Sequence, residues 1–303
     1  MDNAAPRVFV GPRSDRPLTD VVTAAGGELV DSAKEADTLV MTGGPDALAE
    51  LDHPGIRVVQ LPSAGVEGWF AAGVLREGVT YVSATGAYAP ACAEHALALM
   101  LALARRLDEY AGTSTWQPVD GTTLFGAHVC VVGAGGIGTE LIRLMAPFGV
   151  EVDAVTNSGR PVEGAHSVAA DALTDTVASA DFVVNALPVT QATRGAIAGA
   201  QFQAMKESAY LVNVGRGATI AGDDLVAALT DGQIAGAGLD VTDPEPLPDG
   251  HPLWTTPRTL ITCHTANPTS LNADALRQRV AENIRRLVAG VELIGQVDLD
   301  RGY

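Results

Sequence analysis

The chain alternates short apolar runs with stretches of helical periodicity. In its first third the apolar runs are rich in Val and Leu and are short enough to be buried strands. The predicted strands are 7–10, 38–41, 57–61 and 79–82, and the predicted helices are 17–26, 45–52 and 69–78. This alternation of strand and helix predicts a parallel sheet with helices on its faces.

A second and longer series of the same kind begins at His128. Its predicted strands are 128–133, 150–155, 181–187, 210–215, 236–241 and 259–263. Six strands separated by helical spacers predict a doubly wound sheet. An amphipathic helix at 268–290 follows the last strand with no strand after it, and we expect it to cross back to the first domain. The predicted domains are residues 1–92 with 268–303, and residues 93–267.

The segment 91–110 is predicted to form one helix that is apolar on nearly every face over its middle turns. A helix of this kind must be covered on all sides. A position between two domains covers it, and so does a second subunit. We favour both, and hence a homodimer, while an ordinary core helix is the alternative.

The first strand of the second series leads into a glycine-rich motif. Gly133, Gly135 and Gly138 have the G-x-G-x-x-G spacing between an apolar strand and a helix with one apolar face. These glycines permit a tight turn, a close approach to a pyrophosphate, and contact of helix with strand. The helix N-terminus, with Gly136 and Ile137, offers unpaired N–H groups to phosphate. The motif therefore predicts a dinucleotide cofactor, NAD(H) or NADP(H).

The strand after this motif bears on the choice of dinucleotide. NAD sites usually carry an acid at the tip of that strand, where it binds the ribose 2′-hydroxyl. Here Asp153 lies inside the strand, and the tip reads Thr156-Asn157-Ser158-Gly159-Arg160. Because the tip has no acid and an arginine is close by, a 2′-phosphate is tolerated. We therefore favour NADP(H), with a plain loop arginine as the alternative interpretation of Arg160.

Three polar residues, Arg216, Glu245 and His264, each follow an apolar run of the second series. If these strands lie parallel, the side chains emerge at the carboxyl edge, where open α/β sheets bind ligands. A histidine can give a proton to a ketone oxygen, and an adjacent carboxylate favours its charged form. A guanidinium matches a carboxylate and can polarise a carbonyl. Each residue alone is more often a capping, loop or structural group, but the combination points to an anionic substrate and to the movement of one proton.

With these residues the chain resembles the D-isomer-specific 2-hydroxyacid dehydrogenases over essentially its whole length. The matching segments are 61–69, 93–103, 133–138, 186–195, 211–217, 234–248, 251–254 and 260–266. The combination of NVGRG, LDVTDPEPLP and the late histidine is specific. The resemblance implies two Rossmann-like doubly wound α/β domains: a smaller, flavodoxin-like substrate domain and a larger dinucleotide-binding domain.

The resemblance also implies a role for each matching residue. Arg216 binds the substrate carboxylate and keto oxygen, His264 is the general acid/base, and Glu245 is its carboxylate partner. Asp240 lies near the nicotinamide carboxamide. Backbone N–H groups hold the substrate carboxylate, and the corresponding residues are Ser63, Ala64 and Gly65. The other implied cofactor contacts are Leu187, Pro188, Thr193, Val214 and Gly215.

Two positions depart from the family pattern. The residue before the histidine is often proline, and here it is Cys263, which we expect to point away from the cleft. The substrate loop commonly reads G-V-D, and here it reads Gly65-Val66-Glu67. This second departure could alter substrate preference.

The composition of the chain limits the binding partners, the cellular compartment and the metal sites that we expect. The formal net charge of −17 disfavours nucleic acid and anionic membranes as partners. No apolar stretch is long enough to span a membrane, and the N-terminus lacks a signal-peptide layout. Cys92, Cys130 and Cys263 are widely spaced and form no metal-type pair, so we expect reduced thiols, a cytoplasmic protein and no metal site. His95, at the start of the long helix, is expected to be structural.

The leading hypothesis is an NAD(P)H-dependent reductase that converts a small 2-keto acid, such as glyoxylate or hydroxypyruvate, to the D-2-hydroxy acid. The alternative is a dinucleotide-sensing binding module of the corepressor type, without turnover. Formate oxidation is a third possibility within the same superfamily. That branch has glutamine beside the histidine, so Glu245 argues against it.

Overall fold

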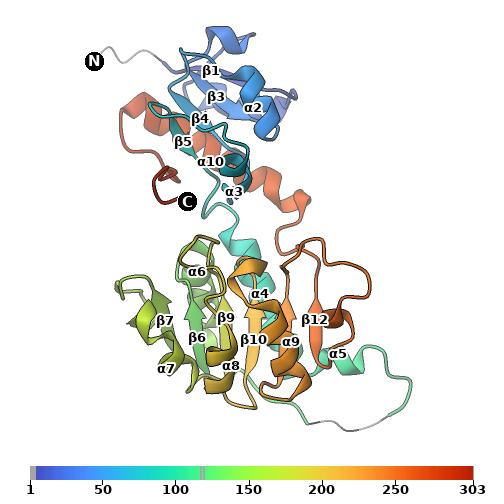
Figure 1. The fold of residues 1–303 in the computed structure, drawn as a ribbon. Helices are drawn as coiled ribbons and strands as arrows, with labels where there is room; N and C mark the ends of the chain where they lie inside the picture. The colour runs from blue at the N-terminus through green and yellow to red at the C-terminus, as the bar shows by residue number, and fades with distance from the viewer. Residues whose placement is uncertain (1–4, 117, 119, 303) are drawn as a thin grey trace. The chain divides into compact units, whose positions relative to one another are not determined.

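The computed structural model describes residues 5–116, 118 and 120–302. The chain divides into two compact units: unit 1 comprises residues 1–88 and 268–303, and unit 2 comprises residues 89–267. Each unit is built on its own parallel sheet (Figure 1). The first boundary between the units lies between residues 88 and 89, where a helix begins. The boundary predicted from the sequence was between residues 92 and 93.

Unit 1 contains a five-stranded sheet in the order β2-β1-β3-β4-β5, and every neighbouring pair is parallel. Its strands are β1 (Arg7–Gly11), β2 (Glu28–Leu29), β3 (Thr38–Met41), β4 (Val58–Gln60) and β5 (Thr80–Val82). β3, with the sequence TLVM, is buried at all four positions, as expected for a strand that is covered on both faces. The two-residue strand β2 was not predicted, because it is too short to show a period.

Helices cover both faces of this sheet. α1 (Arg16–Ala24) and α10 (Thr269–Ala289) pack on one face through a cluster that includes Val8, Val22 and Ile284. α2 (Pro45–Leu51) and α3 (Glu67–Ala71) pack on the other face through a second cluster that includes Leu48 and Trp69. The predicted helix at 69–78 was wrong in its extent, since α3 ends at Ala71 and Gly73 follows with a φ of +65°.

Unit 2 contains a seven-stranded parallel sheet in the order β12-β11-β10-β9-β6-β7-β8. Its strands are β6 (His128–Val132), β7 (Glu151–Thr156), β8 (His166–Ala169), β9 (Phe182–Asn185), β10 (Tyr210–Asn213), β11 (Gly236–Leu239) and β12 (Thr259–Ile261). All six strands of the second predicted series are present. The edge strand β8, with the sequence HSVA, was missed because it has no fully buried position.

The helices of unit 2 lie in two layers. α4 (Ala89–Ala104) and α6 (Gly136–Met145) pack on one face of the sheet. α7 (Leu173–Val177), α8 (Gly199–Ala204) and α9 (Gly222–Thr230) pack on the other (Figure 1). Two parallel α/β sheets with helices on both faces confirm the predicted fold class.

The predicted single helix at 91–110 is corrected by the structure. α4 ends at Ala104, and a separate short helix, α5 (Leu107–Tyr110), follows. Arg106 between them has a left-handed φ of 51°, which an α-helix cannot continue through. Seven residues of α4 are buried. No helix of the described residues has the length and apolarity needed to cross a membrane.

Candidate active site

The glycine-rich motif forms the turn between β6 and α6. Gly133 has a φ of +96°, and a Cβ at Gly138 would lie 2.3 Å from the Gly133 carbonyl oxygen, so helix and turn touch only because no side chain intervenes. The N-cap of α6 is Gly135, which has no side chain to cap the helix, and the first turn carries no acid. The N–H groups at this end are therefore left for an anion.

Residues at the tip of β7 lie beside this turn. Arg160 Nη2 donates to the carbonyl oxygen of Ala134, between the first two glycines, at 2.5 Å. Asn157 and Ser158 are exposed, whereas Thr156 is buried and its hydroxyl has no partner among the described residues. An orphaned buried hydroxyl and an uncapped helix terminus are features that a bound dinucleotide can satisfy.

Asp153 does not point to the tip. One of its carboxylate oxygens lies 2.8 Å from His128 Nε2, and the other lies 2.8 Å from His166 Nδ1. The acid is therefore engaged by two imidazoles on the neighbouring strands β6 and β8, as its position within the strand suggested. Among the described residues of the tip, 156–160, there is no carboxylate.

Arg216, Glu245 and His264 follow β10, β11 and β12, which are neighbours in the sheet. Because these strands are parallel, all three loops leave the same edge. His264 Nδ1 lies 2.5 Å from Glu245 Oε1, and both side chains are about half exposed. With Nδ1 directed at the carboxylate, the other ring nitrogen, Nε2, is left for a second partner.

The Arg216 loop is held against the Glu245 loop. A Cβ at Gly217 would lie 1.9 Å from the carbonyl oxygen of Thr242, so only glycine permits this contact. The backbone oxygen of Arg216 accepts from Thr219 Oγ1 at 2.6 Å and from Asn213 Nδ2 at 3.3 Å. Gly217 was not among the predicted site residues, although it is the final glycine of the motif NVGRG.

Asp240 lies directly after β11 and is 2% exposed. Burial raises the pKa of the Cys92 thiol on α4 to about 11; Asp240 adds to the rise and Arg216 opposes it. Asp240 and Arg216 therefore both lie close enough to Cys92, in the first turn of α4, to affect its pKa.

The other predicted cofactor residues lie in the loops after β9 and β10. Thr193 Oγ1 donates to the carbonyl oxygen of Pro188 at 2.6 Å. A Cβ at Gly215 would lie 2.6 Å from the carbonyl oxygen of Leu187, so these two loops touch through a glycine. Val214 is buried beneath them.

The predicted substrate loop, 63–65, belongs to unit 1 and follows β4. Ser63 Oγ donates to the carbonyl oxygen of Gly65 at 2.6 Å and accepts from Trp69 Nε1 at 3.1 Å. Thr85 Oγ1 donates a hydrogen bond to the carbonyl oxygen of Ala64 at 3.0 Å. Among the described residues, the N–H groups of Ala64 and Gly65 have no acceptor.

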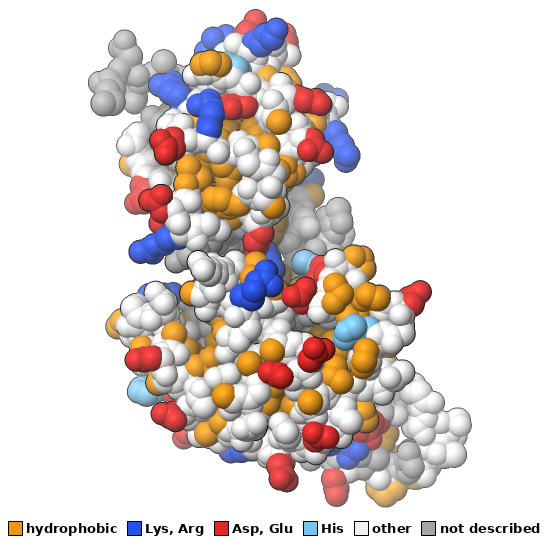
Figure 2. Space-filling view, viewed as in Figure 1, with side chains coloured by type: hydrophobic (Ala, Val, Ile, Leu, Met, Phe, Trp, Pro, Cys, Tyr) orange, Lys and Arg blue, Asp and Glu red, His pale blue; other side chains and the backbone are white. Residues whose placement is uncertain are grey.

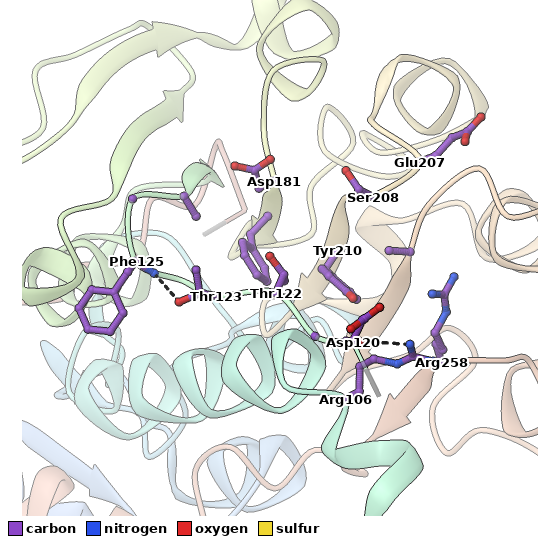
Figure 3. Close-up of a pocket in the computed structure, with 15 residues that line it drawn as sticks. Arg106, Asp120, Thr122, Thr123, Phe125, Asp181, Glu207, Ser208, Tyr210 and Arg258 are labelled. Atoms are coloured by element: carbon purple, nitrogen blue, oxygen red, sulfur yellow. Dashed lines mark hydrogen bonds between the residues drawn. The ribbon is translucent and has the colours of Figure 1, made fainter. Parts of the chain in front are cut away.

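A cavity of about 490 Å³ lies elsewhere in unit 2 (Figure 3). Its lining includes Arg106, Asp181, Tyr210 and Arg258, which lie at or before the amino ends of β9 to β12 or after α4. It is thus at the opposite edge of the sheet from the residues described above. Among the described residues, no cluster of His, Cys, Asp and Glu could hold a metal ion.

On the face of unit 2 shown in Figure 2, charge is distributed rather than concentrated. On the face shown in Figure 2, acidic side chains are scattered over unit 2 and form no single patch. An anionic ligand of this protein, whose net charge is −17, therefore depends on local groups such as Arg160, Arg216 and the α6 N-terminus.

A glycine-rich strand–turn–helix and a histidine–carboxylate pair at the same edge of one parallel sheet are features of a dinucleotide-dependent enzyme. Residues 97–266 match the family model described as "D-isomer specific 2-hydroxyacid dehydrogenase, NAD binding domain". The chain is 40% identical to an uncharacterised protein of Corynebacterium melassecola, covering 94% of this chain and 96% of that one. It is 36% identical to a glyoxylate/hydroxypyruvate reductase A of Yersinia enterocolitica, covering 69% of this chain and 68% of the relative.

Among solved structures, the chain is similar to a D-isomer specific 2-hydroxyacid dehydrogenase from Xanthobacter autotrophicus in complex with NADPH and MES. The TM-score is 0.85 at 27% identity, covering 99% of this chain and all of that one. The chain therefore belongs to the D-isomer specific 2-hydroxyacid dehydrogenases, which are NAD(P)-dependent oxidoreductases. This membership confirms the predicted family and enzyme class.

Proposed function

We propose that the protein reduces a small 2-keto acid to the D-2-hydroxy acid, with NADPH preferred over NADH. The bound dinucleotide supplies the hydride. His264 donates the proton to the ketone oxygen, Glu245 orients the imidazole through its contact with Nδ1, and Arg216 holds the substrate. Glyoxylate and hydroxypyruvate are the substrates to test first, because the Yersinia relative is named for both.

The observation that carries this proposal is the 2.5 Å contact between His264 Nδ1 and Glu245 Oε1. A carboxylate on Nδ1 fixes the ring so that the Nε2 proton is the one to be delivered. Among the described residues, Nε2 has no hydrogen-bond partner, as a proton donor to a substrate requires. Delivery of this proton neutralises the alkoxide that forms during reduction.

Arg216 suits the anchoring role because its backbone is fixed and the residue as a whole is half-buried at the same sheet edge. A half-buried guanidinium offers a stronger contact to a carboxylate than a fully solvated one. We assign the other contact with the carboxylate to the N–H groups in the loop Ser63, Ala64 and Gly65. The unpaired donors of Ala64 and Gly65 support this assignment. We place Asp240 beside the nicotinamide.

The preference for NADPH rests on the tip of β7 and on one relative. The tip offers Asn157, Ser158 and Arg160 and no carboxylate, so it can accept a 2′-phosphate without repulsion. The Xanthobacter protein was crystallised with NADPH. We assign the remaining dinucleotide contacts to Gly133 and Gly135–Gly138, to Thr156, and to the loops that contain Leu187, Pro188, Thr193, Val214 and Gly215.

A panel of 2-keto acids assayed with NADPH and with NADH tests the proposal. We expect kcat/KM with NADPH to exceed that with NADH, and glyoxylate or hydroxypyruvate to be turned over. A ratio below one overturns the cofactor preference. The absence of turnover with every acid, although NADPH binds, favours the dinucleotide-sensing module instead.

Two substitutions separate the assigned roles. Arg216→Ala is expected to raise KM and lower kcat, with a combined loss of about 2–4 kcal/mol in transition-state binding. His264→Gln is expected to lower kcat most while NADPH affinity, measured by fluorescence titration, stays within about threefold. Full activity in either variant removes that residue from the mechanism.

We also propose a homodimer formed through the 91–110 region, in the reducing cytoplasm, where free thiols persist. Support comes from three large apolar side chains, Leu107, Trp116 and Phe125, which are exposed on the segment after α4. Sedimentation equilibrium of the wild type and of Leu107→Asp tests this. A wild-type monomer, or an unchanged dimer in the variant, contradicts the proposed interface.

A further inference from the structure

His264 lies in a turn whose backbone is unfavourable for its residues. Cys263 and His264 have φ values of 49° and 56°, which are left-handed. Residues other than glycine are disfavoured in this region, because their Cβ atom lies too close to the following carbonyl oxygen. The turn that presents the imidazole must therefore be held in place by its surroundings.

Asp240 holds this turn. Its carboxylate accepts from Thr265 N at 2.8 Å, from Ala266 N at 3.1 Å and from Thr262 Oγ1 at 2.7 Å. Its backbone oxygen accepts from His264 N at 2.6 Å. One buried acid thus fixes both sides of the strained pair, so its own position decides where the imidazole sits.

His95 of α4 completes this arrangement. Its Nε2 lies 2.9 Å from Thr262 Oγ1 and 3.4 Å from Asp240 Oδ1. A threonine hydroxyl has one proton, and here that proton goes to Asp240, so the oxygen accepts from His95. His95 therefore carries hydrogen on Nε2, and a chain of donors runs from α4 through Thr262 to the acid that holds the turn.

The surroundings of His95 leave this chain undisturbed. Cys92, one turn earlier on α4, has a pKa raised by burial to about 11, so the thiol is neutral at physiological pH. Glu94, the neighbouring acid, is exposed. Arg216 and Asp240 are the charged groups that act on Cys92 at this end of the helix.

We propose that His95 is a positioning residue for His264, acting through the hydroxyl of Thr262 and the carboxylate of Asp240. The inference rests on the proposed role of His264 as proton donor. It departs from the expectation that His95 is only structural. The signal in the sequence was a histidine, preceded by Glu94, in a largely apolar helix, and its role depends on the contact of α4 with the turn, which no local pattern shows.

The first test is kinetic. His95→Phe keeps the ring volume and removes the donor, whereas His95→Gln retains an N–H at a similar distance. We expect His95→Phe to lower kcat about 10–100-fold, because small misplacements of a reacting group have effects of this size. KM for the keto acid and Kd for NADPH are expected to stay within about threefold, and His95→Gln to recover most of kcat.

The second test does not require that His95→Phe folds well. Thr262→Val removes the hydroxyl that links the two ends and is expected to lower kcat to a similar extent. If both residues act through one chain, the double variant loses little more than the worse single variant. Additive losses, or normal kcat in both single variants, overturn the proposal.

The third test uses no turnover. In imidazole NMR spectra of the free protein, the signal of His264, identified by its absence in His264→Gln, is expected to shift in His95→Phe and Thr262→Val. The control is His53→Phe in unit 1, which also removes a half-buried histidine, bonded to the Ala33 carbonyl oxygen at 2.7 Å. That control is expected to leave the His264 signal and kcat unchanged.

The outcomes separate this inference from the proposed function. A wild-type protein that reduces no 2-keto acid contradicts the function, while the NMR comparison still decides whether His95 positions the turn. An active wild type whose His264 signal is unmoved in His95→Phe contradicts the inference and leaves the function standing.

Discussion

In each unit the first strand of the sheet leads through a turn into a helix, but the N-termini of these two helices are capped in opposite ways. β1 in unit 1 and β6 in unit 2 are the strands where the strand order reverses, the usual place for a ligand. At the start of α1, Asp15 caps the helix, and its carboxylate accepts from Leu18 N at 3.0 Å. At the start of α6 the cap is Gly135, with no side chain.

The position of a helix after the switch-point strand is therefore not enough to make a phosphate site. A carboxylate cap satisfies the free N–H groups and places negative charge where a phosphate would bind. A glycine cap leaves both the donors and the partial positive charge available. Substitutions at the contact between α6 and its turn, at the two helix caps and in the central strand β6 test this contrast.

Gly138→Val is expected to remove the cofactor site. A Cβ there would lie 2.3 Å from the Gly133 carbonyl oxygen and 3.0 Å from Val131 Cγ1, so α6 must move away from the turn. We expect NADPH binding, followed by fluorescence, to weaken at least about 100-fold, and the melting temperature to fall by several degrees. Gly135→Ala is the control for the melting temperature, because a Cβ at Gly135 meets no protein atom within 4 Å.

Gly135→Asp would give α6 the cap that α1 already has. We expect Kd for NADPH to rise about 10–100-fold, because a carboxylate then competes with the pyrophosphate for the same N–H groups. The free energy of unfolding is expected to stay level or to rise by up to about 1 kcal/mol. Gly135→Asn, which caps without charge, separates the two causes: equal losses in both variants would show that occupancy of the donors matters more than charge.

The same contrast explains how much could be predicted from the sequence. The glycine motif and Arg216, Glu245 and His264 were identifiable because parallel strands bring their carboxyl ends to one edge. The break at Arg106 was not, because the helical pattern continues through it while the backbone turns left-handed. The link between His95 and Thr262 joins residues far apart in the chain, and no local pattern encodes it.

The central strands also differ in what they bury. β1 buries Val8 and Val10, whereas β6 buries Cys130, whose pKa is raised by burial, and further by Asp153, to about 12. A raised pKa means that the Cys130 thiol keeps its proton in the folded state between pH 9.0, the ordinary value for a thiol, and about pH 12. Stability from this group is therefore complete below pH 9 and is lost as the pH rises towards 12.

Cys130→Ala tests this alkaline loss. At pH 8 the wild type is expected to be the more stable, because alanine leaves a small cavity. At pH 10.5 the advantage of the wild type is expected to shrink by about 2 kcal/mol, at about 1.4 kcal/mol per pH unit. Urea unfolding at both pH values measures the gap, and a gap independent of pH would show that the thiol titrates alike in the folded and unfolded states.

Asp15→Ala makes the smallest change and tests the other side of the contrast. Loss of the 3.0 Å contact to Leu18 N is expected to lower the unfolding free energy by about 1 kcal/mol. NADPH affinity is expected to stay unchanged, because the cofactor turn belongs to unit 2. Asp15→Gly, which copies the cap of α6, is expected to lower the unfolding free energy by only a few tenths of a kcal/mol and to create no second dinucleotide site.

The turn of unit 1 lacks the other feature of a phosphate loop, which is a glycine where helix and turn touch. Leu18 occupies the third helical position of α1, the position that Gly138 has in α6. A second NADPH equivalent bound by Asp15→Gly would mean that the cap alone decides which helix binds phosphate.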